Sequence, residues 1–491
     1  HMHTMMSVMD GVIDTAKAIK FASKLGHKAL AITDHNVLQA YPDAFNTLAK
    51  INKGKEKKDA FKVLYGSEMN VVDTDAGLAF KNKEYSLKDQ VYVVYDTETT
   101  GLNCKQDQMI EIGAVKVKND EIIDRFDELI CCDRPLPKII TELTNISDDM
   151  LVGKDTEENV TKRFLEFCGD LPLVAHNAAF DISFVESAVE KYGLKPFNNT
   201  VLDTMGIARA MYPDWKNHKL STLVKNLEVE WDEDKHHRAD YDCEGTAHCF
   251  YKMVNKLDNE HIEKTTDLEK LIDKDNIVKF ARPFHMTMIA KNGEGLRNLF
   301  KIVSLANTKY LYKGKEPKIP RSDIIPIKEG LLFGSGCING EVFDKGFNLD
   351  DEDLRSMMSF YDYIEVYPDN VVSHLIGEDK MFHNKEEYHT YVKRLISIAE
   401  ASNKLVVATS DAHNLRPEDL IYRKIIINQK ANGRLHPLNR KDMHIPNQYF
   451  LTTDEMLENF SYLDEDLRNK IVIENTNKIA DEVEPLQIIK D

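Results

Sequence analysis

The nesting of two sets of metal-ligand residues restricts the fold of this sequence more than any other feature. The histidines of HMHT at the start and the Asp and His of VVATSDAHN at residues 406–414 look like parts of one site. Between them, residues 91–103 read VYVVYDTETTGLN, a buried-strand pattern that runs into two acids spaced two apart. This order indicates one domain inserted into another, and the 491 residues exceed what a single hydrophobic core usually serves.

Two polar stretches indicate where the inserted domain begins and ends. They are KNKEYSLKDQ at residues 81–90 and NKLDNEHIEKTTDLEKLIDKDN at residues 255–276. The sequence between them has a normal single-domain size. We therefore expect an inserted domain at residues 85–255, which divides the surrounding domain into residues 1–84 and 256–430.

The inserted segment has a mixed α/β pattern. Alternating apolar residues and turn residues predict three antiparallel strands at residues 91–99, 109–120 and 121–132. The pattern then predicts a helix at residues 156–170, a strand at 171–177, and a helix at 180–193 that Gly193 ends.

The flanking segments follow a different pattern. A helix expected at residues 14–26 leads into an apolar strand at 28–36, and further apolar runs follow in residues 330–340, 361–368 and, after a helix at 385–404, 405–414. Each run ends in polar residues that can bind a ligand. Parallel strands of α/β barrels deliver sites at their C-terminal ends in this way, so we expect a barrel-like domain.

Composition limits the class of protein. No apolar run approaches the roughly 20 residues of a membrane helix, and the start shows no signal-peptide pattern. We therefore expect no membrane contact. The seven cysteines form no C-x-x-C pair, so we expect a reducing, cytoplasmic environment. The net charge of −18 argues against a long basic face but not against a nucleic-acid enzyme, because metal ions neutralise clustered carboxylates there.

Four acids and one histidine of the inserted segment carry chemistry. Asp96 and Glu98 lie two apart on a predicted strand, so both side chains point to one face. Asp181 stands at a strand-to-helix junction, and Asp242 follows His237 by five residues. Adjacent carboxylates repel unless a hard divalent cation lies between them. A lone D-x-E is more often a solvated strand face, but these elements occur together in one domain-sized segment.

These motifs resemble the DEDDh exonucleases, the DnaQ-like proofreading family. The resemblance rests on DTETTG, HNAAFD and HRADYD, with TELTNISDDML and HKLSTLVKNLEV between them, and covers about residues 90–252. It implies an RNase H-like α/β domain that uses two Mg²⁺ or Mn²⁺ ions bound by Asp96, Glu98, Asp181 and Asp242. His237 would be the general base. His236 is its neighbour and rival, but the spacing of His237 to Asp242 matches the family.

The flanking segments offer a second set of possible ligands. H-x-H at the start and D-x-H near residue 412 place two ligands on one strand face. Imidazole, carboxylate and thiolate together favour Zn²⁺, Mn²⁺ or Fe over Mg²⁺. The candidates are His1, His3, Asp10, His35, Glu68, His285, Cys337, Asp411 and His413.

This ordered set resembles the PHP domain, named for polymerase and histidinol phosphatase. The resemblance covers residues 1 to about 84 and about 277 to 430. It implies a distorted (β/α)₇ barrel with up to three metal ions, whose nine ligand positions these residues occupy. Cys337 stands where many members have His. Glu365 matches no ligand position, and we interpret it as a structural residue.

A PHP domain interrupted by a DEDDh exonuclease is similar to the arrangement of the PolC-type family of bacterial replicative DNA polymerases, in the DNA polymerase III α subunit. That resemblance implies a helical segment at residues 431–491 that leads towards a polymerase region. It also implies three kinds of partner: a DNA primer 3′ end, the polymerase module of the same full-length chain, and replisome proteins such as the sliding clamp. The sequence contains no Gly-rich nucleotide loop and no palm-type D-x-D pair.

The leading hypothesis is therefore a proofreading 3′→5′ exonuclease, and three alternatives remain. The first is a phosphoesterase of small phosphate esters that acts at the PHP site. The second is a non-catalytic, metal-stabilised replisome scaffold. The third is an exonuclease that acts on RNA, because no local residue tells how the site treats a 2′-hydroxyl.

Overall fold

A computed structural model describes residues 1–56, 59–73, 77–102, 104–105, 107–230, 239–273, 278–279, 281–312, 316–377, 380–430, 435–439 and 444–489. The chain divides into two compact units. One, here called the outer unit, comprises His1–Thr74 and Ala281–Asp491, and the other, the inserted unit, comprises Asp75–Phe280. None of the helices among the described residues has the length and apolar character that a membrane crossing requires.

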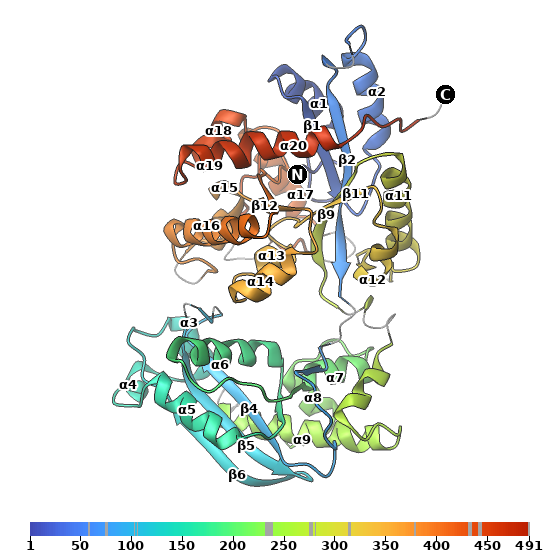
Figure 1. Ribbon diagram of the computed structural model, residues 1–491. Coiled ribbons are helices and arrows are strands. Elements are labelled where there is room, and N and C mark those ends of the chain that lie inside the picture. Colours follow the sequence, from blue (N-terminus) through green and yellow to red (C-terminus); the bar gives the residue numbers. More distant parts are fainter. Residues whose placement is uncertain are drawn as a thin grey trace. The chain divides into compact units, whose positions relative to one another are not determined.

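The outer unit is built on a curled seven-stranded sheet in the order β1-β2-β9-β11-β12-β13, with β10 paired to β2 (Figure 1). The strands are β1 (Ala29–His35), β2 (Lys62–Val72), β9 (Phe284–Ala290), β10 (Ile319–Pro320), β11 (Leu331–Gly334), β12 (Tyr363–Val366) and β13 (Leu405–Ala408). The expected parallel pairing holds for β1 with β2 and for β11, β12 and β13. It does not hold for β9, which is antiparallel to both β2 and β11.

The first residues join the two ends of this sheet. Met2 forms a parallel bridge with Ala412, just beyond β13, and the His3 N–H donates to the Ala412 carbonyl at 2.8 Å. On the other side, the Thr33 N–H of β1 donates to the Met2 carbonyl at 3.0 Å. The backbone of residues 1–3 therefore lies between β1 and the segment after β13, at the end of the sheet where the polar residues gather.

Helices pack on the sheet, and the sequence pattern predicted two of them, at residues 14–26 and 385–404. The helices of this unit are α1 (Thr15–Lys24), α2 (Tyr41–Ile51), α11 (Gly293–Thr308), α12 (Arg321–Ile324), α13 (Glu341–Asp344), α14 (Asp351–Met358), α15 (Asp369–Val372), α16 (Lys385–Ala401) and α17 (Leu420–Ile427). In α1, Asp14 caps the N-terminus and Ala18, Ile19 and Ala22 form the buried stripe. The helical C-terminus is confirmed by α18 (Thr453–Asn459), α19 (Glu465–Asn469) and α20 (Asn475–Glu482).

The inserted unit has a six-stranded sheet in the order β3-β8-β7-β4-β5-β6. Its strands are β3 (Ala79–Phe80), β4 (Tyr92–Thr99), β5 (Met109–Lys118), β6 (Glu121–Leu129), β7 (Leu173–Ala175) and β8 (Val201–Asp203). The predicted antiparallel meander of β4, β5 and β6 is confirmed, and β7 and β8 run parallel to β4. The helices are α3 (Lys138–Thr144), α4 (Asp148–Leu151), α5 (Glu157–Cys168), α6 (Ala178–Tyr192), α7 (Thr204–Met211), α8 (Leu220–Asn226) and α9 (Ala239–Asp258).

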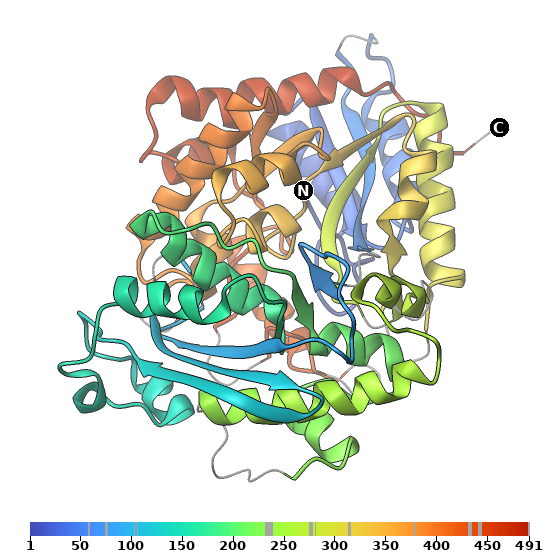
Figure 2. The same cartoon turned by 60° about the horizontal axis from the view of Figure 1, so that its bottom comes forward.

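Strand β4 is buried on both faces by helices. Tyr92 and Val94 belong to the hydrophobic core that includes Phe250 of α9, and α9 runs along the sheet as Figure 2 shows. Val93 and Tyr95 belong to the opposite core, which includes Phe164 of α5. Because side chains alternate along a strand, Asp96 and Glu98 continue the row that faces α9.

Candidate metal centres

In the inserted unit, three of the predicted acids converge. Asp96 and Glu98 lie near the end of β4, and Asp242 lies in the first turns of α9. Each offers one carboxylate oxygen, and these oxygens all lie within 4.8 Å of one another. Strand periodicity supplies the first two, and the packing of α9 on β4 supplies the third.

Asp181 joins this group from the first turn of α6. Its Oδ1 accepts hydrogen bonds from the Thr97 N–H at 3.0 Å and from the Thr97 hydroxyl at 2.8 Å, which fixes it beside β4. Burial raises the pKa of Asp181 to about 7 although these hydrogen bonds lower it. Burial, followed by repulsion from Asp181 and Glu98, raises the pKa of Asp96 well above its usual value. Such carboxylates become stably ionised only beside a cation.

A fifth acid, Glu111, escaped the sequence analysis. It is fully buried on β5 directly opposite Glu98, and one of its carboxylate oxygens accepts a hydrogen bond from the Ala239 N–H at 3.1 Å. Ala239 is the first residue of α9, so Glu111 holds the helix that carries Asp242. The run MIEIGAV was a usable signal, because it places a single carboxylate inside an otherwise apolar strand.

The predicted general base of the inserted unit is His237. His237 and its neighbour His236 lie outside the described residues. The described backbone resumes at Ala239, where α9 begins. Asp242 lies on this helix, three residues after its start.

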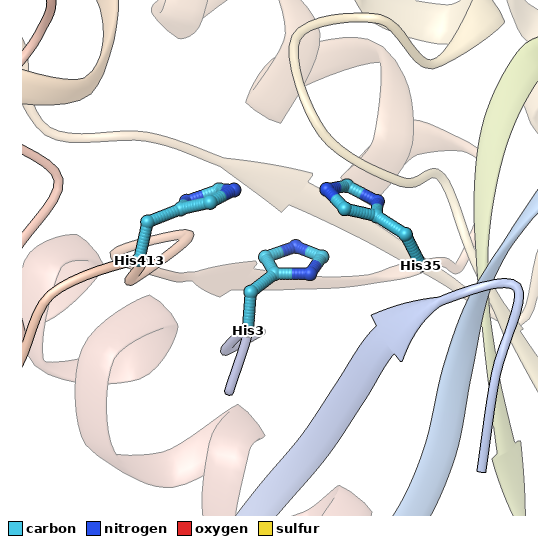
Figure 3. Close-up of side chains that lie close together, drawn as sticks. All are labelled: His3, His35 and His413. Carbon is cyan, nitrogen blue, oxygen red and sulfur yellow. The ribbon is translucent and has the colours of Figure 1, made fainter. Parts of the chain in front are cut away.

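In the outer unit, three histidines from distant parts of the sequence meet. His3, His35 and His413 each offer a ring nitrogen, and these nitrogens lie within 4.8 Å of one another (Figure 3). The ring of His3 stacks on those of His35 and His413, with centroids 4.0 Å and 4.3 Å apart. Burial, followed by the charges of His35 and His413, lowers the pKa of His3 well below its usual value, so its imidazole is neutral and able to bind a metal.

Glu68 contacts three histidines, one of which, His35, also belongs to the stacked group. Its oxygens approach His1 Nε2 at 2.8 Å, His35 Nδ1 at 2.9 Å and His285 Nδ1 at 2.6 Å. His285 reaches this point because β9 is antiparallel: its first residues lie at the sheet edge where the parallel strands end. In the antiparallel pairing of β2 with β9, Glu68 lies directly opposite Thr287, which follows His285 by two residues.

The two aspartates of the set also contact the histidines. Asp10 Oδ2 is 3.1 Å from both His35 Nε2 and His413 Nε2. Asp411 Oδ1 is 3.2 Å from His3 Nε2. Asp411 follows β13 in left-handed backbone with φ of 41°, so strand periodicity is not the reason that Asp411 and His413 converge.

Cys337 completes the predicted set. Its buried Sγ lies 3.0 Å from His285 Nδ1 and accepts a hydrogen bond from the Asn339 N–H at 3.4 Å. Burial, followed by the charges of Glu68 and Asp411, raises the pKa of the thiol well above its usual value. The thiolate therefore requires a metal to form.

The interpretation of Glu365 as a purely structural residue misses a contact that the structure shows. Its carboxylate lies 2.8 Å from His1 Nδ1, while the opposite ring nitrogen of His1 faces Glu68. Burial lowers the pKa of His1, but the charges of Glu365, Glu68 and Asp411 outweigh it and raise the pKa well above the usual value. This geometry resembles the carboxylate–histidine pairs that support metal ligands.

The outer-unit residues fit a metal centre because several of their buried polar atoms have no hydrogen-bond partner. Buried atoms without a hydrogen bond include His1 Nε2, His3 Nε2, both carboxylate oxygens of Glu68, and Asp411 Oδ1. Several of these atoms are within ion-pair distance of one another yet are not aligned as donor and acceptor. These atoms converge on a common point, and a cation bound there would satisfy their unmet need for a polar partner.

Models of known sequence families match the chain in two places. The PHP domain family matches residues 1–171 and 175–403. The exonuclease family RNase_T matches residues 93–250, which lie within the inserted unit.

Two curated relatives align along the whole chain. The DNA polymerase III PolC-type of Halalkalibacterium halodurans is 42% identical over 491 residues, which are 100% of this chain and 33% of the relative. The DNA polymerase III PolC-type of Bacillus subtilis is 41% identical over 492 residues, with the same two coverages. The chain therefore spans 33% of the length of these relatives.

A solved structure of exonuclease X in complex with 5′ overhanging duplex DNA is 26% identical and covers 34% of this chain and 92% of its own. Its TM-score is 0.27.

Proposed function

Because the chain belongs to the PHP-domain family and carries an exonuclease-family domain within it, we propose that the inserted unit is a metal-dependent 3′→5′ exonuclease. Its substrate is a DNA primer end, single-stranded or frayed, from which it removes mismatched nucleotides as nucleoside monophosphates. The observation that carries this proposal is the convergence of Asp96, Glu98 and Asp242 beside the buried Asp181.

The proposed roles follow from the chemistry of these residues. Asp96, Glu98, Asp181 and Asp242 hold Mg²⁺ or Mn²⁺, which are hard cations that prefer carboxylate oxygens. Two such ions, when bound, supply activation of the attacking water and stabilisation of the leaving 3′ oxygen. His237 takes the proton from that water, since an imidazole with a near-neutral pKa suits this task. Glu111 orients α9, and with it Asp242, towards β4.

For the outer unit, we propose a metal centre that stabilises the fold. His1, His3, His35, His285 and Glu68 supply the nitrogen and oxygen atoms that favour Zn²⁺, Mn²⁺ or Fe, with up to three ions in the whole set. The buried unpaired atoms support this role, because each would destabilise the metal-free fold. The same convergence favours a second candidate function, hydrolysis of small phosphate esters at this centre.

The chain aligns with 33% of the length of its PolC-type relatives, and the proposed substrate and partners take this into account. We propose that the chain works beside a polymerase module in a longer protein of the PolC type, in the bacterial cytoplasm, with the sliding clamp and other replisome proteins as further partners. The basic channel of such a module would supply much of the phosphate contact, so this chain alone should bind DNA weakly and with steep salt dependence.

The test is degradation of 5′-labelled single-stranded DNA by the purified chain with Mn²⁺ at low salt. A ladder that shortens from the 3′ end and disappears in Asp96→Ala, but persists in His413→Ala, supports the exonuclease proposal. A ladder that disappears only in His413→Ala would move the activity to the outer unit. Cleavage of the corresponding RNA at an equal rate would contradict the assignment to DNA.

A further inference from the structure

Asp10 and Asp411 share an arrangement that the metal-centre proposal alone does not explain. In each carboxylate, one oxygen faces the histidines and the other is held from behind by a buried side chain. The residues behind them are Arg423 of α17 and Gln448, which follows α17 in the chain. Neither residue belongs to the predicted ligand set.

Asp10 is anchored through its Oδ1. Arg423 donates to this oxygen from Nη2 at 2.7 Å and from Nε at 3.1 Å. Asp10 Oδ2 is thereby left towards His35 and His413, each with Nε2 at 3.1 Å. Two N–H groups of one planar guanidinium thus hold a single carboxylate oxygen in place.

Asp411 is anchored through its Oδ2. Gln448 Nε2 donates to this oxygen at 2.8 Å, while Oδ1 faces His3 and has no hydrogen bond. The carbonyl of Gln448 also accepts the N–H groups of His413 at 2.7 Å and Asn414 at 3.1 Å. One residue thus holds both the side chain of Asp411 and the backbone of the segment that carries His413.

The two anchors are joined to each other. Arg423 Nη1 donates to Gln448 Oε1 at 2.5 Å, and the side chain of Arg423 is only 1% exposed. Its neighbours on α17 behave differently, because Tyr422 is 60% exposed and Ile425 is 52% exposed. A fully buried arginine is costly unless its charge is paired, and Asp10 supplies that pairing.

We propose that Arg423 and Gln448 are positioning residues that couple metal binding in the outer unit to the packing of α17 and of the segment around Gln448. This inference rests on the metal centre proposed above and specifies how that centre is regulated. Metal bound by Asp10 and Asp411 holds the Arg423–Gln448 pair in place, and the packed pair orients both carboxylates for the metal. Linkage requires the two effects to be reciprocal.

The first arm of the test measures Mn²⁺ affinity in the full chain, in an Asp96→Ala background that removes the inserted-unit site. Arg423→Met and Gln448→Leu should each weaken Mn²⁺ binding by about ten- to a hundredfold, as is typical of groups that orient metal ligands. Arg423→Lys should be intermediate, because a lysine restores the charge beside Asp10 but cannot also reach Gln448 as a planar fork does. Arg394→Met is the matched control.

Arg394 is suited to that purpose because it also makes several hydrogen bonds in the outer unit, to Asp351, Gly346 and Leu349, and touches none of the proposed ligands. Its loss should lower the melting temperature of the metal-free and Mn²⁺-loaded forms equally and leave Mn²⁺ affinity unchanged. A merely structural role for Arg423 would give the same result as this control.

The second arm measures hydrogen exchange with and without Mn²⁺. Mn²⁺ should slow exchange of the His413, Asn414 and Phe450 amides, whose bonds join the segments around residues 413 and 448, and this slowing should be lost in Gln448→Leu. If the Asp96→Ala chain binds no Mn²⁺, the metal centre and this coupling both fail. Two results would overturn the coupling alone, provided that the Asp96→Ala chain binds Mn²⁺. The first is equal Mn²⁺ affinity in Arg423→Met, Arg423→Lys, Gln448→Leu and the unaltered Asp96→Ala chain. The second is hydrogen exchange that does not change when Mn²⁺ is added.

Discussion

Glu98 on β4 lies directly opposite Glu111 on β5, with both side chains on the face of the sheet that α9 covers. Two acids in a cross-strand pair normally destabilise a sheet. Glu111 also accepts the N–H of Ala239, where the positive end of the α9 dipole favours a negative charge. The pair therefore joins the proposed metal cluster to the start of the helix that carries Asp242.

Replacing Glu111 should impair the exonuclease without removing a proposed metal ligand. We expect Glu111→Ala to lower the nuclease rate by about ten- to a hundredfold, because α9 loses its anchor and Asp242 shifts from β4. Glu111→Gln keeps an acceptor for Ala239 and should retain more activity than Glu111→Ala. Rates on labelled DNA at several Mn²⁺ concentrations test this, and equal rates for the two variants would contradict the anchoring role.

The pH dependence of stability should reveal Asp181. Its pKa of about 7 in the fold lies above the usual value of 3.8, so the folded state retains a proton that the unfolded state releases between those values. The free energy of unfolding of the metal-free inserted unit should therefore fall as the pH rises from about 4 to about 7, by up to about 1.4 kcal/mol per pH unit for this proton. Asp181→Asn can still accept the bonds from Thr97 and should flatten the dependence.

The measurement is thermal unfolding in chelator at a series of pH values. Asp124→Asn, which alters a largely exposed carboxyl on β6, is the control and should keep the wild-type slope. An unchanged slope in Asp181→Asn would mean that Asp181 is ionised in the metal-free fold.

Glu365 should matter for metal binding although it is not itself a predicted ligand. Glu365→Gln removes the charge beside His1 Nδ1 that raises the pKa of His1, so His1 becomes a weaker base. We expect Mn²⁺ affinity in the Asp96→Ala background to fall about ten- to a hundredfold. The control is Glu341→Gln, because Glu341 is equally buried but pairs with Arg321 and Tyr361 instead. Equal affinities for the two variants would return Glu365 to a structural role.

Metal removal should separate the two units. At free metal about a hundredfold above its dissociation constant, binding adds about 2.7 kcal/mol, so chelation should lower the melting temperature of the outer unit by about 5 to 10 °C. His413→Ala should lose most of this chelator effect and keep its nuclease activity, which calorimetry and the DNA assay measure together. A well-folded His413→Ala chain without nuclease activity would show that the outer unit takes part in the reaction.

Local patterns predicted much of the fold and singled out acids that the structure brings close together. Asp96 and Glu98 share a face because they are two residues apart on one strand, and this spacing can be read from the sequence alone. The direction of β9 was not predictable in this way, because an apolar run such as FHMTMIA reads the same in a parallel or an antiparallel strand. His285 consequently lies at the start of a strand and not at its end.

The supporting residues escaped prediction for a related reason. Arg423 stands in LIYRKIII, where nothing local distinguishes it from Lys424, yet tertiary packing buries the first against Asp10. Gln448 and Glu365 likewise acquire their roles from residues distant in the sequence. Burial and pairing across such distances are properties of the packed fold, which residue spacing does not encode.

The most direct test of the central claim is the first product released from a DNA primer labelled at its 3′-terminal nucleotide, with Mn²⁺ and within a single turnover. If the acids of the inserted unit form a 3′→5′ exonuclease site, the wild-type chain and His413→Ala will release the label at once as a nucleoside monophosphate, and Asp242→Ala will release none. Release of longer labelled fragments, or release by Asp242→Ala at the wild-type rate, would contradict the account.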